Sequence, residues 1–291
     1  MPRRPADDAP APPSPGSVLR PVERWREGRR RHLGDHIAEE VPVAFVYNDA
    51  PFAVMMATPA DLEDFALGFA LSEGIVDDIA EARIERIEQL LEGVEIRLAI
   101  PAARAEALER RRRSLSGRSG CGICGSELLE AALRQPEPVR ADVRTDAGAL
   151  RRALRELKAA QALNARTGAT HAAGWAALDG RLQLLREDVG RHNALDKLIG
   201  AMRRAGEDAG DGFLVVTSRA SYEMAMKAAS AGIALMAAVS APTALAISLA
   251  ERANLTLIGF ARTDGHAVYT HPRRLLEEPP TRLATPGKPM P

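Results

Sequence analysis

Apolar residues in the first half of the chain change their spacing several times, and each spacing predicts a different element. Strict alternation of apolar and polar positions is typical of a strand with one buried face, whereas apolar residues three or four positions apart indicate a helix. The expected elements are, in chain order, strand 41–47, strand 52–57, a helix that starts at Thr58-Pro59 and stops at Gly74, strand 94–100 and a helix that ends in Arg110–Arg113. The first half is therefore predicted to be a small α+β region.

The second half alternates between helical patterns and short, nearly continuous apolar runs. Such runs are typical of strands that are buried on both faces of a sheet, and their alternation with helices indicates a layered α/β domain. The dipeptide Asp179-Gly180 between two β-favouring runs predicts a tight hairpin. The expected elements are helix 147–164 ended by Thr167-Gly168, strands 172–178 and 181–185, helix 191–204, strand 213–217, helix 221–231, strand 233–239, helix 243–253 and strand 256–260.

Segments without any apolar period mark both ends of the chain, and a segment rich in glycine and serine separates the two halves. Pro- and Ala-rich composition is typical of disorder, and dense glycine favours a mobile loop. We accordingly predict a disordered tail at 1–20, an N-terminal α+β region at 21–113, a mobile cysteine loop at 114–125, an α/β domain at 126–270 and a Pro-rich tail at 271–291.

The charge balance and hydropathy exclude several classes of protein. The 291 residues include 39 basic and 39 acidic side chains, so no net field directs the chain toward nucleic acid or an anionic membrane surface. The longest apolar run, 233–239, is too short to span a bilayer. Arg3-Arg4 is followed by Pro, Ala and Asp rather than by the apolar stretch of an export signal. We expect a cytoplasmic protein with neither a nucleic-acid nor a membrane partner.

The only two cysteines, Cys121 and Cys124, lie together in the glycine-rich segment. A structural zinc site needs about four ligands, so we expect no metal. A thioredoxin-like dithiol normally begins a helix directly after a strand, whereas glycines flank both cysteines here. An accessible thiolate on such a loop is suited to accept a sulfur atom as a persulfide and to pass it on by exchange chemistry. The residues alone leave a redox dithiol, a zinc site and a pair of incidental cysteines open as alternatives.

Three polar, glycine-punctuated segments in the second half each follow or end a predicted strand. Ligands of open α/β sheets gather at the carboxyl ends of strands, where helix N-termini bind phosphates. Arg191, Arg219 and Arg262 would add bidentate phosphate recognition. The pattern predicts an anionic, nucleotide-bearing ligand, and the alternative is that these residues cap helices and form surface ion pairs. The three segments are 187–197, 217–224 and 259–262.

Six longer stretches of sequence carry a resemblance to a known family. They are GCGICG at 120–125, HAAG at 171–174, EDVGRHNALDKLIG at 187–200, SRASYEMAMKAASAGI at 218–233, AVSAPTALAISLAE at 238–251 and TLIGFAR at 256–262. Together they resemble the formate dehydrogenase accessory sulfurtransferase family, FdhD, from roughly Val41 to Thr270.

The resemblance implies a fold, an activity and a set of partners. The α/β domain would be layered like a cytidine deaminase, and the protein would form a homodimer. It would act as a sulfurtransferase that takes a persulfide sulfur from a cysteine desulfurase and sulfurates the molybdenum bis-molybdopterin guanine dinucleotide cofactor, bound as cargo, for an apo-formate dehydrogenase. Cys121 and Cys124 are implied as the catalytic residues, with a modest preference for Cys121 as the persulfide carrier. The residues assigned to cofactor binding are Phe260, Ala261, Arg262, Thr263, Asp264, Gly265, Arg191, His192, Ser218 and Arg219.

The sequence also departs from the zinc deaminases whose fold the resemblance implies. These enzymes carry His-x-Glu and Pro-Cys-x-x-Cys motifs, whereas His171 is followed by Ala172 and Ala173, and no thiol follows strand 213–217. We expect the metal pocket to be rebuilt for the phosphates of a guanine dinucleotide. Two alternative functions are a non-catalytic cofactor chaperone and a dithiol oxidoreductase.

Overall fold

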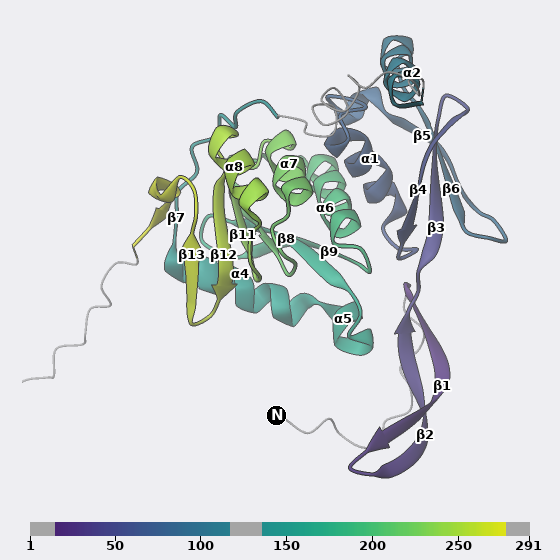
Figure 1. Ribbon diagram of the computed structural model, residues 1–291, viewed down its shortest axis with the longest axis vertical. Helices are drawn as coiled ribbons and strands as arrows, with labels where there is room; N and C mark the ends of the chain where they lie inside the picture. The colour runs from purple at the N-terminus through teal and green to yellow at the C-terminus, as the bar shows by residue number, and fades with distance from the viewer. Residues whose placement is uncertain (1–14, 117–135, 278–291) are drawn as a thin grey trace, which may run out of the picture.

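The computed structural model describes residues 15–116 and 136–277 as an N-terminal unit, a larger C-terminal unit and a projecting arm (Figure 1). Each unit has its own apolar core, one drawn from residues 43–100 and the other from residues 139–261. Cys121, Cys124 and residues 117–125 of the predicted loop lie outside the described residues. Within the described ranges no helix has both the length and the apolar character needed to cross a bilayer.

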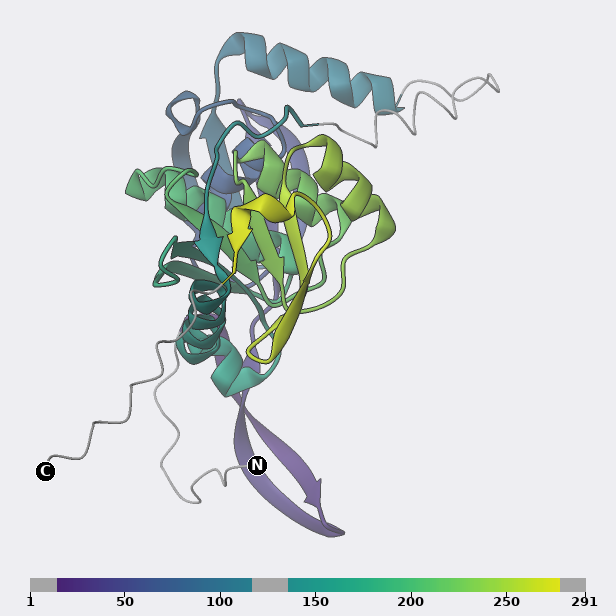
Figure 2. The same cartoon turned by 90° about the vertical axis from the view of Figure 1, so that its left-hand side faces the viewer.

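A long two-stranded arm, which we did not predict, precedes the N-terminal unit (Figures 1 and 2). Strands β1 (Ser17–Arg26) and β2 (Arg29–Ala38) pair antiparallel along their whole length, and both turn residues have positive φ, 51° at Glu27 and 73° at Gly28. Such a two-residue turn matches the twist of the strands. The predicted tail boundary at residue 20 is therefore wrong. The arm was missed because charged residues occupy positions at which a strand with a buried face would show apolar alternation.

The N-terminal unit is a four-stranded sheet that packs against two helices. The strands have the order β4-β3-β6-β5, and α1 packs on the inner face through rings such as Phe69, whose centroid lies 4.3 Å from that of Phe45. The predicted hairpin, both helices and strand 94–100 are confirmed, whereas β5 was not predicted. The elements are β3 (Val41–Tyr47), β4 (Ala50–Ala57), α1 (Leu62–Ser72), the 3-10 turn Ile79–Glu81, β5 (Arg83–Gln89), β6 (Val94–Ala99) and α2 (Ala102–Ser116).

The predicted helix start at Thr58-Pro59 is wrong. Helix α1 begins at Leu62, after Asp61 in a left-handed conformation with φ 53°. Thr58 is fully buried; its N–H donates to Asp188 Oδ2 at 3.0 Å, and its hydroxyl accepts from the N–H of Val189 at 3.2 Å. The Thr58 hydroxyl therefore accepts a hydrogen bond from the C-terminal unit instead of capping α1, as the local sequence pattern had predicted.

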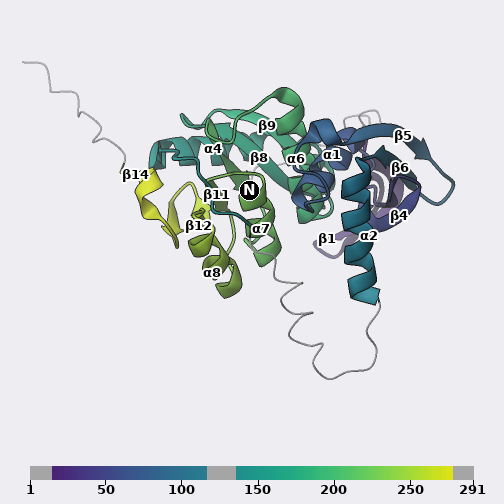
Figure 3. The ribbon, with the colours of Figure 1, turned by 90° about the horizontal axis from the view of Figure 1, so that it is seen from above.

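The C-terminal unit is a six-stranded mixed sheet between helices, with the strand order β13-β12-β11-β10-β8-β9. Strands β10, β11 and β12 run parallel, and β8 runs antiparallel to β10. Helix α4 covers one face of the sheet, and α7 and α8 cover the other (Figure 3). The elements are β7 (Thr145–Asp146), α4 (Ala147–Ala160), α5 (Ala162–Thr167), β8 (His171–Ala177), β9 (Leu182–Asp188), α6 (Arg191–Ala205), β10 (Gly212–Val216), α7 (Tyr222–Ser230), β11 (Leu235–Ala238), α8 (Ala244–Arg252), β12 (Thr256–Arg262), β13 (Gly265–Val268) and β14 (Leu275–Leu276). The α/β class is confirmed.

Two predicted boundaries in this unit need correction. Helix 147–164 is divided at Gln161 because the buried Glu187 carboxylate accepts the N–H groups of Leu163 and Asn164, each at 2.8 Å, and so starts a separate helix. The predicted tail 271–291 is folded as far as residue 277. There β14 pairs with β7, and the side chain of Arg274, 1% exposed, donates to three backbone and hydroxyl oxygens.

The two units meet where helices α1 and α6 cross at backbone contact. A methyl group added at Gly68 would lie 1.7 Å from the carbonyl oxygen of Asp196, and one added at Gly200 would lie 1.9 Å from the carbonyl oxygen of Asp64. No side chain fits between the helices at this crossing, so the glycines set the distance between the units.

Candidate functional site

The carboxyl ends of β10, β11 and β12 lie side by side at one edge of the C-terminal sheet, which we call the strand-end site. Because β8 is antiparallel to β10, its first residue His171 reaches the same edge, and β9 ends there at Asp188. Helices α6, α7 and α8 begin directly after these strand ends. The site comprises His171, residues 188–192, 217–221 and 240–243, and Phe260–Arg262. It thus combines strand ends and helix N-termini, the usual location of ligands in such sheets.

Helix α6 differs from its two neighbours in its N-terminus. Ser221 and Thr243 cap α7 and α8 with their own side chains, which accept N–H groups of the first turn. The N-cap of α6 is Gly190, which provides no side-chain cap. An uncapped helix start keeps unpaired N–H donors and a partial positive charge. Of the three helices, α6 therefore offers the best position for an anion.

Three arginines of the strand-end site have no carboxylate partner among the described residues. Within residues 15–116 and 136–277, Arg191, Arg219 and Arg262 form no ion pair, and the enclosed Nε of Arg191 has no hydrogen-bond acceptor. Arg219 and Arg262 are exposed. A buried donor without an acceptor costs about 1–3 kcal/mol, and an anionic ligand would supply the missing acceptor. The sequence analysis expected these arginines at one edge, and the structure places them there.

Two histidines lie beside Arg191. Burial lowers the pKa of His171, and the charge of Arg191 lowers it further. Burial also lowers the pKa of His192; Glu223, whose Oε2 lies 2.9 Å from Nε2, opposes this effect, and Arg191 adds to it. The His192–Glu223 contact is close but is not aligned as a hydrogen bond. Both imidazoles are therefore neutral near pH 7 and leave the arginines as the positive charges of the site.

Phe260 occupies an unusual position at the end of β12. Its backbone is left-handed with φ 50°, its side chain is 45% exposed, and it lies where the β12–β13 register shifts. Its N–H donates to the carbonyl oxygen of Ser240 at 3.1 Å, which fixes the strand end. A bulky residue in this conformation is rare and is concentrated at functional sites. The ring is thus available for stacking beside Arg262, and exposed Thr263 and Asp264 form the turn to Gly265.

Other polar residues of the 187–200 segment hold the two units together. Asp188 and Lys197 are both fully buried, with Nζ 2.6 Å from Oδ2, and Lys197 also donates to the carbonyl oxygen of Thr58 at 2.9 Å. The side-chain amide of Asn193 donates to the carbonyl oxygen of Met56 at 2.8 Å and to Asp188 at 3.0 Å. These three residues form buried contacts between the units rather than the surface ion pairs of the alternative interpretation, whereas Arg191 and Ser218 lie at the strand-end site.

A second buried cluster joins α1 to α6 and α7. The ammonium group of Lys227 lies 2.9 Å from both carboxylate oxygens of Asp196, 2.9 Å from Ser72 Oγ and 3.0 Å from Glu73 Oε1. Burial disfavours the charged lysine, but Asp196 and Glu73 outweigh burial and raise the pKa of Lys227. The sequence analysis missed Ser72 and Glu73, which end an ordinary amphipathic helix and carry no local signal of an interface.

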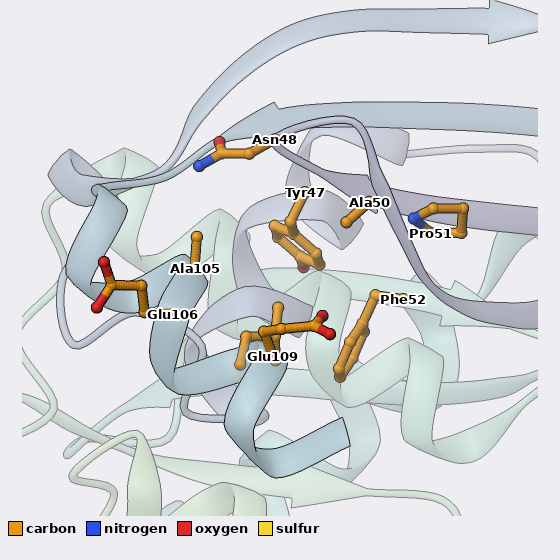
Figure 4. Close-up of a pocket in the computed structure, with 9 residues that line it drawn as sticks. Tyr47, Asn48, Ala50, Pro51, Phe52, Ala105, Glu106 and Glu109 are labelled. Atoms are coloured by element: carbon orange, nitrogen blue, oxygen red, sulfur yellow. The ribbon is translucent and has the colours of Figure 1, made fainter. Parts of the chain in front are cut away.

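A separate pocket of about 310 Å³ lies between α2 and the β3–β4 hairpin (Figure 4). Tyr47 and Phe52 form an apolar wall opposite Glu106 and Glu109 on α2. Within the described residues the Tyr47 hydroxyl is buried without a hydrogen-bond partner, and burial raises the pKa of Tyr47, with Glu73 adding to the effect. Across residues 15–116 and 136–277 no three His, Cys, Asp or Glu side chains are placed to hold a metal ion.

Comparison with known proteins gives consistent findings. Residues 38–276 match the model of the FdhD/NarQ family. Sulfur carrier protein FdhD of Xanthomonas campestris pv. campestris is 62% identical over 264 residues, which cover 91% of this chain and 94% of that protein. The protein of the same name from Cupriavidus necator is 53% identical over 257 residues, which cover 88% and 89%. A crystal structure described as a formate dehydrogenase accessory protein from Desulfotalea psychrophila aligns with a TM-score of 0.69 and 27% identity over 90% of this chain and 100% of that chain.

Proposed function

Because the chain belongs to the FdhD/NarQ family, we propose that it is a sulfur carrier in the maturation of formate dehydrogenase. Relatives at 62% and 53% identity carry the name sulfur carrier protein, and the structural neighbour is described as a formate dehydrogenase accessory protein. We propose further that the sulfur comes from a cysteine desulfurase and goes to the molybdenum of a bis-molybdopterin guanine dinucleotide cofactor. The cofactor is cargo that the protein binds and releases.

The sulfur steps of this proposal use Cys121 and Cys124, which lie outside the described residues. One thiolate attacks the terminal sulfur of the desulfurase persulfide, and the desulfurase thiolate leaves. The other thiolate then attacks the inner sulfur of the new persulfide, which releases hydrosulfide to the acceptor and leaves a Cys121–Cys124 disulfide. A cellular thiol reduces this disulfide and so supplies the two electrons of each turnover.

The observation that carries the cofactor assignment is the strand-end site itself, where the uncapped start of α6 and three arginines without ion pairs among the described residues share one edge of the sheet. Arg191, Arg219 and Arg262 carry the charge opposite to that of phosphates, and a guanidinium group can bind a phosphate in a bidentate manner. Phe260 presents a ring face on which guanine can stack. We assign Ser218, His192 and the rest of the 260–265 segment to the same site. We also infer that the C-terminal unit has the layering of a cytidine deaminase and that the protein is a homodimer in the cytoplasm.

A cofactor chaperone without sulfur transfer is the second candidate, since the strand-end site is formed without either cysteine. Mass spectrometry separates the two functions. The protein is incubated with a cysteine desulfurase and cysteine, and wild type is compared with Cys121→Ala and Cys124→Ala. A sulfane adduct on the 120–125 peptide that one substitution removes supports the carrier. Absence of any adduct, with nucleotide binding intact, would leave only the chaperone.

Nucleotide binding tests the strand-end site directly. Isothermal titration with GDP, which reproduces the guanine and diphosphate end of the cofactor, compares wild type with Arg219→Ala and Arg262→Ala. Loss of a charge-assisted phosphate contact weakens binding by roughly tenfold or more. Arg181→Ala is the matched control, because exposed Arg181 pairs with Asp179 in the β8–β9 turn at the opposite edge. Equal GDP affinity in all four proteins contradicts the assignment.

A further inference from the structure

The β1–β2 arm has two chemically different faces. Directly opposite residues of an antiparallel pair share a face, and faces alternate along each strand. The register pairs Arg24 with Arg31 and Arg26 with Arg29, so four arginines lie together on one face at the tip. We call this the arginine face. The pair Val22 and Leu33 continues it toward the base of the arm.

The arginine face is electrostatically unfavourable in the isolated chain. Like charges directly opposite each other destabilise a ribbon, and a two-stranded ribbon is only marginally stable in water. Arg24 pairs with Asp35 at 2.6 Å. Within the described part of the chain, Arg26, Arg29 and Arg31 have no ion-pair partner, and all three are exposed. An anionic surface of another molecule would attract these arginines and offset their mutual repulsion.

The opposite face satisfies its own charges. There Trp25 Nε1 donates to Glu23 Oε1 at 2.9 Å, and Arg30 lies 3.4 Å from Glu23 Oε2. The unmet charge is thus confined to the arginine face, which gives the docking surface a defined direction.

The arginine face suits a protein better than a nucleic acid. Apolar surface lies next to the arginines on this face. It is formed by half-buried Val22 and Leu33 and, near the base of the arm, by the cross-strand pair of Val18 with Ile37, which is 42% exposed. A phosphate backbone offers nothing for that apolar surface to cover, whereas a protein surface offers both carboxylates and apolar groups.

The arm emerges beside the strand-end site. Residue Gly16 at its base lies against Thr58 and Leu163, and Thr58 in turn binds Asp188 and Val189 at the end of β9. The base of the arm therefore lies beside the edge at which α6 begins, and the arm projects from there (Figures 1 and 2). The arm precedes the segment 38–276 that matches the family model.

We propose that the arginine face docks an acidic, partly apolar surface of the enzyme that receives the ligand of the strand-end site. The choice of this partner rests on the proposed function, under which the recipient is the apo-formate dehydrogenase. Docking on the arm places the recipient against the site, so that release and uptake of the ligand occur within one complex.

The variant Arg26→Glu/Arg31→Glu tests this proposal without weakening the arm. Each substitution places a carboxylate opposite a remaining arginine, Arg29 or Arg24, so the cross-strand pairs become attractive while the face loses its positive charge. The matched control Arg83→Glu/Arg86→Glu makes the same change of charge on exposed β5 residues of the N-terminal unit. Binding of the full chain to purified apo-formate dehydrogenase is measured by biolayer interferometry at low and at rising salt.

We expect the arm variant to bind roughly tenfold or more weakly, with a smaller dependence on salt, and the control to bind within about twofold of wild type. Equal binding by the arm variant, or no binding by wild type, overturns the proposal. A 20-base-pair DNA duplex and vesicles of equal parts phosphatidylglycerol and phosphatidylcholine are run in parallel. Arm-dependent binding to either of these, without arm-dependent binding to the enzyme, also overturns it.

The same preparations are assayed for GDP binding and for the persulfide adduct. The arm variant should retain both, because positions 26 and 31 are far in sequence from α6 and from both cysteines. Loss of docking with both retained supports the arm as a separate element. Absence of both in wild type would be a failure of the proposed function, whereas their presence with unchanged docking would be a failure of the arm proposal alone.

Discussion

Replacing Lys197 with methionine tests whether the buried Asp188–Lys197 pair holds the two units together. Both side chains are fully buried, with Nζ 2.6 Å from Oδ2. Removing one partner of a buried pair leaves the other charge uncompensated and costs about 3–5 kcal/mol. The remaining donors to Asp188 are the N–H groups of Thr58 and Gly190 and the amide of Asn193, so we expect the lower half of that range.

The assay is thermal and urea denaturation of the full chain. For a chain of this size a loss of about 3–4 kcal/mol lowers Tm by roughly 6–16 °C. Lys158→Met is the matched control at an exposed position of α4 and should change stability by less than about 0.5 kcal/mol. The double variant Asp188→Asn/Lys197→Met should lose at least about 1 kcal/mol less unfolding free energy than the sum of the losses in the two single variants. A loss below about 1 kcal/mol for Lys197→Met, or strict additivity in the double variant, would refute the reasoning.

Two further predictions concern pH and the helix crossing. Since burial and Arg191 lower the pKa of His171, the ring takes up a proton only below the usual value of about 6.5. Acidification below that pH adds positive charge to the site, so sulfate, whose own charge stays constant, should bind more tightly in calorimetry. His171→Asn should reduce this gain and leave the part that belongs to His192. The same preference for the neutral ring makes the ligand-free fold less stable below that pH. Gly200→Ala should cost about 3 kcal/mol or more in urea denaturation, because the methyl group meets a backbone oxygen of Asp64 at 1.9 Å. Gly265→Ala, at which a methyl group meets no atom within 4 Å, should be nearly neutral, and an equal loss in both variants would contradict the packing argument.

The sequence predicted the C-terminal unit well because its elements follow simple periods. Buried strands there are continuous apolar runs, helices carry apolar stripes, and Ser221 and Gly168 terminate elements as their types suggest. The rule that ligands gather at strand carboxyl ends predicted that Arg191, Arg219 and the end of β12 lie at one edge of the sheet.

The errors arose where long-range contacts override the local pattern. Thr58 resembles a helix cap but forms hydrogen bonds with the C-terminal unit. Arg274 lies in a Pro-rich segment, yet its side chain is buried and donates to three oxygens. The arm lacked a pattern because its strands cover no core. Polarity alone did not separate ligand-facing from buried residues in the 187–200 segment. A signal was nevertheless present, since 193, 196, 197 and 200 follow the spacing of one helical face.

The buried clusters between the units determine how the protein can be dissected. Residues 136–277 look like an independent domain with a complete sheet and its own core. Expressed alone, this fragment would present Asp196 and Lys227 without Ser72 and Glu73, and Lys197 without Thr58, on a helix face grooved by glycine. The start of α6 would also lose the neighbour that fixes its position. The two halves are therefore better regarded as complementing fragments that regain the strand-end site only on reassociation than as separable modules.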